Sequence, residues 1–377
     1  MDDALVTEEA FDALLGALAA EGRTVIGPQV RDGAIVLDEL SGVADLPIGW
    51  ADDQGPGRYR LRRRDDDAHF GFTTPSTSWR PFLHPAHETV FRARLDGGGF
   101  EVEPPPAPPP LAFVGVRACD LRGIEVQDRV LRDGAFPDAG YAARRADVFV
   151  IAADCSESGP TCFCASMGSG PAAEAGFDLA VAERLDGDRP RFFVRVGTER
   201  GAALLARVEH QPADDADRAD AAAAAERAAA GQVRSVPATS VAGLLARNLE
   251  HPRWDEVAER CLACTNCTMV CPTCFCTNVE DSVDLGATVA ERTQRWDSCF
   301  TLDFTYLAGA PVRGSVRSRY RQWLTHKLST WVDQFDELGC VGCGRCVTWC
   351  PVGIDLTEEV AAIAAADGAL RPEGSTP

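Results

Sequence analysis

Residues 261–272 read CLACTNCTMVCP, and residues 340–351 read CVGCGRCVTWCP. Both stretches place cysteines at steps of three, three and four and end on Cys-Pro, which is the spacing of bacterial ferredoxin motifs. Thiolates also suit zinc or copper(I), because soft metals select sulfur ligands. Three closely spaced cysteines followed by a fourth before proline favour a cubane iron–sulfur cluster over zinc or copper(I). The two stretches therefore predict a pair of [4Fe–4S] clusters.

The two stretches predict crosswise ligand sets, because the fourth cysteine of such a motif ligates the other motif's cluster. The first cluster is expected on Cys261, Cys264, Cys267 and Cys350. The second is expected on Cys340, Cys343, Cys346 and Cys271. The segment between the motifs is longer than a compact ferredoxin needs and is predicted to be helical at 285–295 and 317–327. It resembles the helical two-cluster domain in the iron–sulfur subunits of succinate dehydrogenase and heterodisulfide reductase.

Four further cysteines are predicted to meet at the edge of a sheet. Cys119 follows the apolar run 111–116, and Cys155 follows the apolar run 148–152. The intervening residues have helical periodicity, so we expect two parallel strands whose carboxyl ends share the edge where open α/β sheets bind ligands. With Cys162 and Cys164 on the next loop, four thiols would suffice for a third [4Fe–4S] cluster. Packed free thiols and a zinc ion are the alternatives.

Three cysteines have no predicted role. They are Cys274, Cys276 and Cys299. The sequence Thr-Cys-Phe-Cys occurs at both 161–164 and 273–276, so one of the first two thiols is a candidate to replace a ligand of the third cluster. Cys299 has no evident partner, and we expect a packed thiol there.

The rest of the chain divides into two predicted domains. A helix is expected at 6–20, a stiff spacer at the proline-rich residues 104–110, and an exposed helix or linker at the Ala/Asp-rich insertion 209–235. Strand signals fade near residue 240. We therefore expect a mixed α/β domain over 1–240, followed by an all-helical two-cluster ferredoxin domain over 241–377.

Composition narrows the class of protein. The chain has 377 residues, 37 Lys and Arg against 57 Asp and Glu, and a net charge of −20, which argues against nucleic acid or an anionic membrane as partner. No apolar run is long enough to span a bilayer, and the N-terminus lacks a secretory signal, so we expect no membrane insertion and a cytoplasmic location. That compartment is reducing, which favours metal ligation over disulfides for the 15 cysteines.

One basic stretch stands out in this acidic chain. Residues 313–327 contain four arginines and Lys327 but no acidic residue. Cations near a thiolate-bound cluster stabilise its negative charge and raise its potential. Docking to an acidic partner and a solvated helix face are the alternatives. No catalytic triad, phosphate-binding loop or zinc-protease motif is present, so we expect a non-catalytic subunit.

Four segments carry a family resemblance. They are GVRACDL at 115–121, CFCASMGSGP at 162–171, RYRQWLTHK at 319–327 and GCGRCVTWCPVGID at 342–355. They resemble the beta subunits of cytosolic, NADP-linked [NiFe] sulfhydrogenases, and the A subunit of anaerobic sulfite reductase has similar motifs. The resemblance implies an electron-transfer subunit that works between a flavin subunit handling NAD(P)H and the [NiFe] hydrogenase subunits. A sulfite-reductase relay and a self-contained α/β reductase that binds its substrate near Cys119 and Cys155 are the alternatives.

Overall fold

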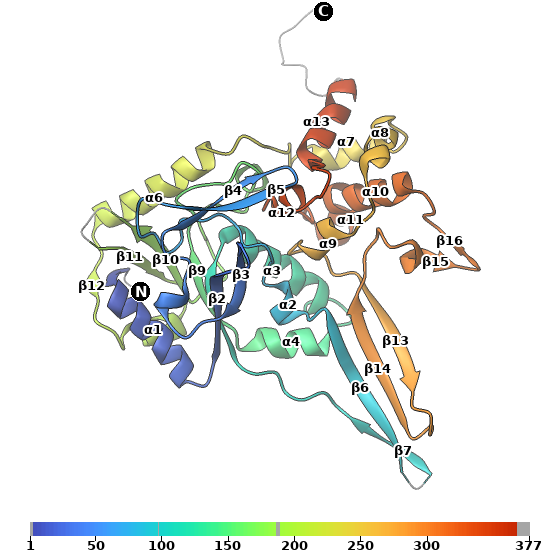
Figure 1. Cartoon of the computed structure of the whole chain (residues 1–377), viewed down its shortest axis with the longest axis horizontal. Coiled ribbons are helices and arrows are strands. Elements are labelled where there is room, and N and C mark those ends of the chain that lie inside the picture. The colour runs from blue at the N-terminus through green and yellow to red at the C-terminus, as the bar shows by residue number, and fades with distance from the viewer. Residues whose placement is uncertain (1–2, 97, 186–188, 368–377) are drawn as a thin grey trace, which may run out of the picture.

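A mixed eight-stranded sheet forms the centre of the larger lobe in the computed structural model, which describes residues 3–96, 98–185 and 189–367 (Figure 1). The strand order is β12-β1-β11-β10-β9-β8-β2-β3, and β2, β8, β9 and β10 are parallel neighbours. The strands are β1 (Ala4–Thr7), β2 (Thr24–Arg31), β3 (Ala34–Glu39), β8 (Leu111–Val116), β9 (Phe149–Ala153), β10 (Leu179–Arg184), β11 (Arg191–Val196) and β12 (Gln211–Pro212).

Both faces of this sheet are covered, which explains why β8 and β9 are apolar throughout and buried at every residue. Ala112 and Val114 of β8 pack on one side with Phe11 of α1. Phe113 packs on the other side with Leu121 of α3. The helices of this lobe are α1 (Glu8–Ala20), α2 (Arg80–Leu83), α3 (Ala118–Leu131), α4 (Ala139–Ala146), α5 (Glu199–Leu205) and α6 (Asp215–Ala230). A separate hairpin, β4 (Trp50–Gly55) and β5 (Arg58–Arg63), and the short 3-10 turns η1 (Val43–Asp45) and η2 (Ala165–Met167) complete it.

Short helices bearing the two ferredoxin motifs form the second lobe (Figure 1). Its core contains Trp254, Leu324, Leu328 and Val360. The elements are α7 (Val241–Arg247), α8 (Arg253–Arg260), α9 (Asn266–Met269), η3 (Leu302–Thr305), α10 (Val316–Thr325), η4 (His326–Thr330), α11 (Trp331–Phe335), α12 (Arg345–Thr348) and α13 (Leu356–Asp367). Two very short strands, β15 (Tyr306–Leu307) and β16 (Ala310–Pro311), pair beside them. No helix in the described ranges is long and apolar enough to cross a bilayer.

The prediction of an all-helical second domain is wrong. Residues expected to be helical at 285–295 belong instead to an antiparallel hairpin of β13 (Thr277–Val283) and β14 (Val289–Trp296). Asp284 closes its turn, since its Oδ1 accepts the backbone N–H groups of Thr288 and Val289. The hairpin is held by a distant strand, because β14 pairs with β6 (His87–Asp96), which pairs with β7 (Gly99–Glu103).

These four strands form an arm that projects from the body (Figure 1). The arm combines strands from both sides of residue 240, and the domain boundary expected there stays a prediction. The insertion 209–235 is largely the helix α6, whose Asp217 and Asp220 pair with Arg184 of β10. It therefore lies against the sheet rather than forming a free linker.

A buried ion pair joins the two lobes. Both terminal nitrogens of Arg345 donate to the carboxylate of Asp120, each at 2.8 Å, and the side chains are 0% and 1% exposed. The Nε of Arg345 donates to the carbonyl oxygen of Pro75. Arg345 lies in the second ferredoxin motif and Asp120 directly follows Cys119, so the pair fixes these motifs against each other.

We expect Asp120→Asn to destabilise the fold strongly, because it leaves the Arg345 charge buried without a counter-ion. The cost should be about 3–5 kcal/mol, as for other broken buried pairs. Replacing both partners with Leu and Met should cost less than the single substitution. Asp53→Asn is the matched control, since its pair with Arg58 is about half exposed and is worth at most about 1 kcal/mol. Urea denaturation midpoints of the four proteins measure the difference, and equal midpoints for the two single variants would contradict it.

Candidate iron–sulfur sites

The two ferredoxin motifs fold into loops of the same shape. Ala263 and Thr265 of the first loop have positive φ angles of 50° and 70°. Gly342 and Gly344 occupy the equivalent positions in the second loop, with φ of 64° and 76°. The second loop needs glycine, because a Cβ atom at Gly342 would lie 2.7 Å from the backbone of Cys164. The second motif is thus pressed against the Cys162–Cys164 loop.

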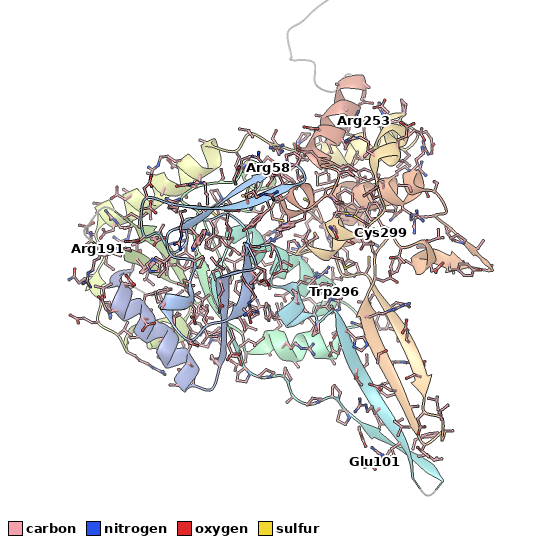
Figure 2. The ribbon with its side chains drawn as sticks, in the orientation of Figure 1. Arg58, Glu101, Arg191, Arg253, Trp296 and Cys299 are labelled. Carbon is pink, nitrogen blue, oxygen red and sulfur yellow. The ribbon has the colours of Figure 1, made fainter. Side chains whose placement is uncertain are left out.

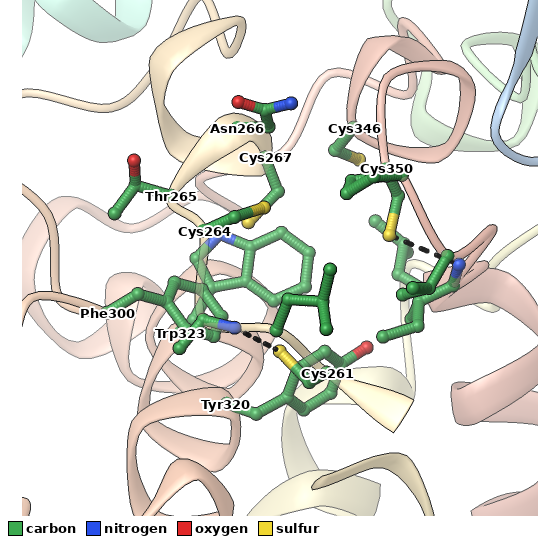
Figure 3. A pocket seen from close by; sticks show the side chains of 16 residues that line it. Cys261, Cys264, Thr265, Asn266, Cys267, Phe300, Tyr320, Trp323, Cys346 and Cys350 are labelled. Atoms are coloured by element: carbon green, nitrogen blue, oxygen red, sulfur yellow. Dashed lines mark hydrogen bonds between the residues drawn. The ribbon is translucent and has the colours of Figure 1, made fainter. Parts of the chain in front are cut away.

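The first predicted ligand set borders one cavity (Figure 3). The cavity is bordered by Cys261, Cys264, Cys267 and Cys350, together with Cys346 of the second set. The loops of the two motifs therefore meet around this cavity, and the crosswise ligand sets stay a prediction. In the described part of the chain, no three His, Cys, Asp or Glu side chains are grouped closely enough to hold a single metal ion.

Hydrogen-bond donors face this cavity. The backbone N–H groups of Ala263 and Ile354 donate to the Sγ atoms of Cys261 and Cys350, at 3.4 and 3.3 Å (Figure 3). Tyr320 and Trp323 also border the cavity, and the phenol O–H and indole N–H have no protein acceptor among the described residues. Buried donors without a partner are rare, so both fit a site that holds sulfide-containing acceptors.

A buried lysine lies beside one cysteine of the second set. The Nζ atom of Lys327 lies 3.3 Å from the Cys271 Sγ, and it donates to Thr273 Oγ1 at 2.8 Å and to the Gly339 carbonyl at 3.4 Å. Burial raises the pKa of the Cys340 thiol to about 12. A hydrogen bond with Cys274, and then the charge of Lys327, hold the pKa of Cys271 well below its usual range. The lysine charge therefore favours a thiolate at this position.

The structure brings the four cysteines of the third set to one edge of the sheet. Cys119 lies in the first turn of α3, directly beyond β8, and Cys155 lies directly beyond β9, as predicted. The Cys162–Cys164 loop is bent rather than extended, because Cys162 N–H bonds to Gly159 O and Cys164 is helical. This turn allows both thiols to face one region, and Gln232 Nε2 donates to the Cys164 Sγ at 3.1 Å.

Two buried cations near the cysteines lack a carboxylate partner among the described residues. Their charges therefore favour anionic groups at these positions. Arg117 is fully buried and donates to several backbone carbonyls, while its charge and its hydrogen bond with Cys155 lower the pKa of that thiol against the larger, raising effect of burial. Lys327 is likewise buried, and neither it nor Arg117 has a carboxylate partner among the described residues. Buried charges are normally paired, so thiolate-bound clusters, which carry negative charge, fit these surroundings.

The remaining cysteines lie near the base of the arm. Cys274 lies beside Cys271, and its carbonyl accepts a 2.7 Å hydrogen bond from Arg80. The backbone of Cys276 pairs with Asp297, two residues before Cys299 (Figure 2). Arg80 stacks on Trp296, with its Cζ 3.3 Å from the ring centroid. Cys274 thus lies beside the second set, Cys276 lies near Cys274 and Cys299, and Cys299 packs against the core of the helical lobe.

Several residues that shape the sites were not identified from the sequence. Arg117, Gln232 and the Arg345–Asp120 pair act through contacts between distant segments, which no local pattern reveals. Lys327, in contrast, belongs to the basic stretch 313–327 that the sequence already suggested as a source of cations near a cluster, and it is the one lysine in the chain. An ammonium is a compact charge with three donors, which matches its three acceptors here.

Comparison with known proteins gives one family match and one curated relative. A family model described as a 4Fe-4S dicluster domain matches residues 260–354. The chain is 34% identical over 246 residues to the sulfhydrogenase 2 subunit beta of Pyrococcus furiosus, and the alignment covers 64% of this chain and 70% of that protein. No solved structure is significantly similar. The resemblance read from the sequence motifs is thereby confirmed.

We expect Gly342→Ala to prevent cluster loading. The new methyl group would overlap the backbone of Phe163 and Cys164 and force the second motif away from the third set. Gly309→Ala is the matched control, since Gly309 also has a positive φ, of 89°, but nothing lies within 4 Å of an added Cβ. Iron per chain and visible absorption should fall in the first variant alone. Full iron loading of both variants would show that the close packing of Gly342 against the Phe163–Cys164 backbone is not needed for cluster binding.

We expect Lys327→Met to lower the reduction potential of the second site, because it removes a buried positive charge beside Cys271. A unit charge about 5 Å away at an effective dielectric of about 20 corresponds to a shift on the order of 100 mV. Arg321→Gln is the control, because Arg321 lies on the adjacent helix α10 and its charge is already paired with Glu250. EPR-monitored redox titration reads the potential directly, and an unchanged midpoint in Lys327→Met would refute this role.

Proposed function

Because the chain belongs to the family of sulfhydrogenase beta subunits, we propose that it is the iron–sulfur electron-transfer subunit of a cytoplasmic [NiFe] hydrogenase-type complex. One observation supports this most directly: two ferredoxin motifs meet crosswise around one cavity, and a third group of thiols lies against the second motif. The named relative favours this assignment over a sulfite-reductase subunit, since no comparison points to the latter.

The proposed ligands are the three sets predicted above. Cys261, Cys264, Cys267 and Cys350 hold the first cluster, and Cys340, Cys343, Cys346 and Cys271 hold the second. Cys119, Cys155, Cys162 and Cys164 hold a third. Such clusters, when bound, accept and donate single electrons. The protein's own part is to present thiolates, to supply N–H donors to them and to exclude water.

The contacts give the sites an order. Cys119 and Cys164 of the third set pack in one apolar cluster with Cys343 of the second. Cys346 of the second set borders the cavity of the first. The second site is therefore central, and a path along the chain's sites runs from the sheet edge through the second site to the first. Cys264 is exposed, so the proposed first site lies close to solvent.

The partners in this proposal are a flavin subunit that handles NAD(P)H and the [NiFe] hydrogenase subunits of a hetero-oligomer. We assign this chain no catalytic residue. The purified chain should therefore show no hydrogen-dependent dye reduction, yet it should be reduced by the reduced flavin subunit. Stopped-flow bleaching of the chain's visible absorption measures that transfer, and hydrogen uptake by the chain alone would overturn the proposal.

We expect anaerobic iron analysis of the chain to give about twelve iron atoms, and Cys155→Ser to remove up to four of them. The loss should leave the EPR signals of the other two clusters intact, because Cys155 lies only at the sheet edge. Cys299→Ser is the matched control and should keep all the iron. An unchanged iron content in Cys155→Ser would exclude the third cluster while leaving the two ferredoxin-type sites in place.

A further inference from the structure

The arm formed by β13, β14, β6 and β7 has one apolar and one charged face. The strand register aligns Val283, Ala290, Ala93 and Val102 in a single row that crosses all four strands. Paired residues of a sheet lie on the same face, and alternate residues along a strand share it. Val279, Leu95 and Phe100 therefore lie on the face of this row. We name this surface the apolar arm face.

The opposite face is polar in the corresponding row. Ser282, Glu291, Arg92 and Glu103 align across the same strands, one position along from the apolar row. Ion pairs link Arg92 to Glu291 at 3.2 Å and Arg94 to Glu103 at 3.1 Å. This polar face can remain exposed to solvent. Its residues also provide matched control positions for substitutions on the apolar arm face.

The apolar arm face is uncovered in the isolated chain. Phe100 is 71% exposed, Val283 63%, Val102 61% and Val279 51%. Contiguous exposed apolar side chains on a protein surface mark interaction sites. Exposed apolar side chains on a projecting sheet also promote aggregation, and natural proteins avoid this by covering such a surface. Figure 1 shows the arm extending away from both lobes, so no element of the described chain covers this face.

The charges on this face define the chemistry of its partner. Asp281 and Arg292 are its charged pair, and they neutralise each other through two 2.7 Å hydrogen bonds. Arg292 also lies 5.5 Å from the ring centroid of Phe91. The face thus presents no net charge to attract a nucleic acid or an anionic lipid surface. It fits an uncharged, apolar protein patch.

The area of the face favours a partner that also contacts the body. Four strands about 4.8 Å apart and about six residues long give roughly 400 Å². Two copies joined by their arms alone would bury about 800 Å², which is below the 1,200–2,000 Å² of stable interfaces. The arm joins the body next to the ferredoxin motifs, because β13 begins directly after Cys276 and β14 ends at Trp296 (Figure 2). Leu262, beside the first cavity, is 62% exposed.

We propose that the apolar arm face docks a redox partner subunit of the complex, which covers the arm and the adjoining surface near the first site. This rests on the proposed function and adds the surface that carries the interaction. The partner contributes an apolar patch against Val102, Val283 and Phe100. A partner bound along the arm would lie beside the solvent-facing Cys264.

Neighbouring residues on opposite faces provide the test. Val283→Lys and Ser282→Lys add the same charge at adjacent, exposed positions of β13, but only Val283 lies on the apolar arm face. Each full-length variant, loaded with iron, is titrated by light scattering against the remaining subunits of the complex purified together. We expect Val283→Lys to weaken binding at least tenfold, as should Val102→Lys on the opposite edge strand. Ser282→Lys should bind like the unchanged chain.

The outcomes separate this proposal from the proposed function. Equal binding of Val283→Lys and Ser282→Lys, with electron transfer retained, overturns the docking surface and leaves the proposed function standing. An unchanged chain that neither binds nor exchanges electrons with those subunits overturns both. A dimer of the isolated chain that Val283→Lys dissociates would make a second copy the occupant and overturn the proposal. Hydrogen exchange gives a second readout, since amides of 277–283 and 99–103 should slow only in the complex.

Discussion

The buried pair of Arg345 and Asp120 is the interaction on which the arrangement of the cysteines depends. Each partner is the immediate or near neighbour of proposed ligands, since Asp120 follows Cys119 and Arg345 lies between Cys343 and Cys346. Removing two charges from water is costly, so such a pair contributes little net stability, but its geometry is strict. The pair instead fixes a position, because it holds the start of α3 in the larger lobe against the second ferredoxin motif in the helical lobe. The close approach of Gly342 to Cys164 follows from that lock.

The chain is acidic overall, but positive charges lie buried beside its cysteines. The chain carries a net charge of −20, yet a buried cation lies beside one cysteine of the third set and beside two of the second, namely Arg117 at Cys155, Lys327 at Cys271 and Arg345 at Cys343. Without bound clusters, burial raises the pKa of most of these thiols, and Arg117 then has no ion-pair partner among the described residues, whereas Arg345 is paired with Asp120. Cluster assembly would displace the thiol protons, and a cluster held by four thiolates would carry net negative charge, which couples folding to metal loading.

Sequence patterns predicted the features that depend on residues close together in the chain. The cysteine spacing indicated the crosswise meeting of the two motifs, and the apolar runs at 111–116 and 148–152 correctly placed Cys119 and Cys155 at one sheet edge. The ligand sets themselves stay predictions. The β13–β14 hairpin was missed because its pairing strand β6 lies far away in sequence, and a short run with one turn fits helix or strand equally well without that partner. Gln232 was missed for the same reason, because its contact with Cys164 joins segments that lie 68 residues apart.

The arm also has a consequence for how the chain is made. Its strands β6 and β7 leave the ribosome well before β14, with most of the central sheet and the first ferredoxin motif synthesised in between. Until β14 arrives, one edge of β6 is open to other nascent chains, and the side chains of Phe100 and Val102 remain exposed even afterwards. Closing so distant a pairing is intrinsically slow. Overproduction of this subunit without its companions should therefore favour inclusion bodies, and coexpression from one transcript would shield the arm as soon as it is complete.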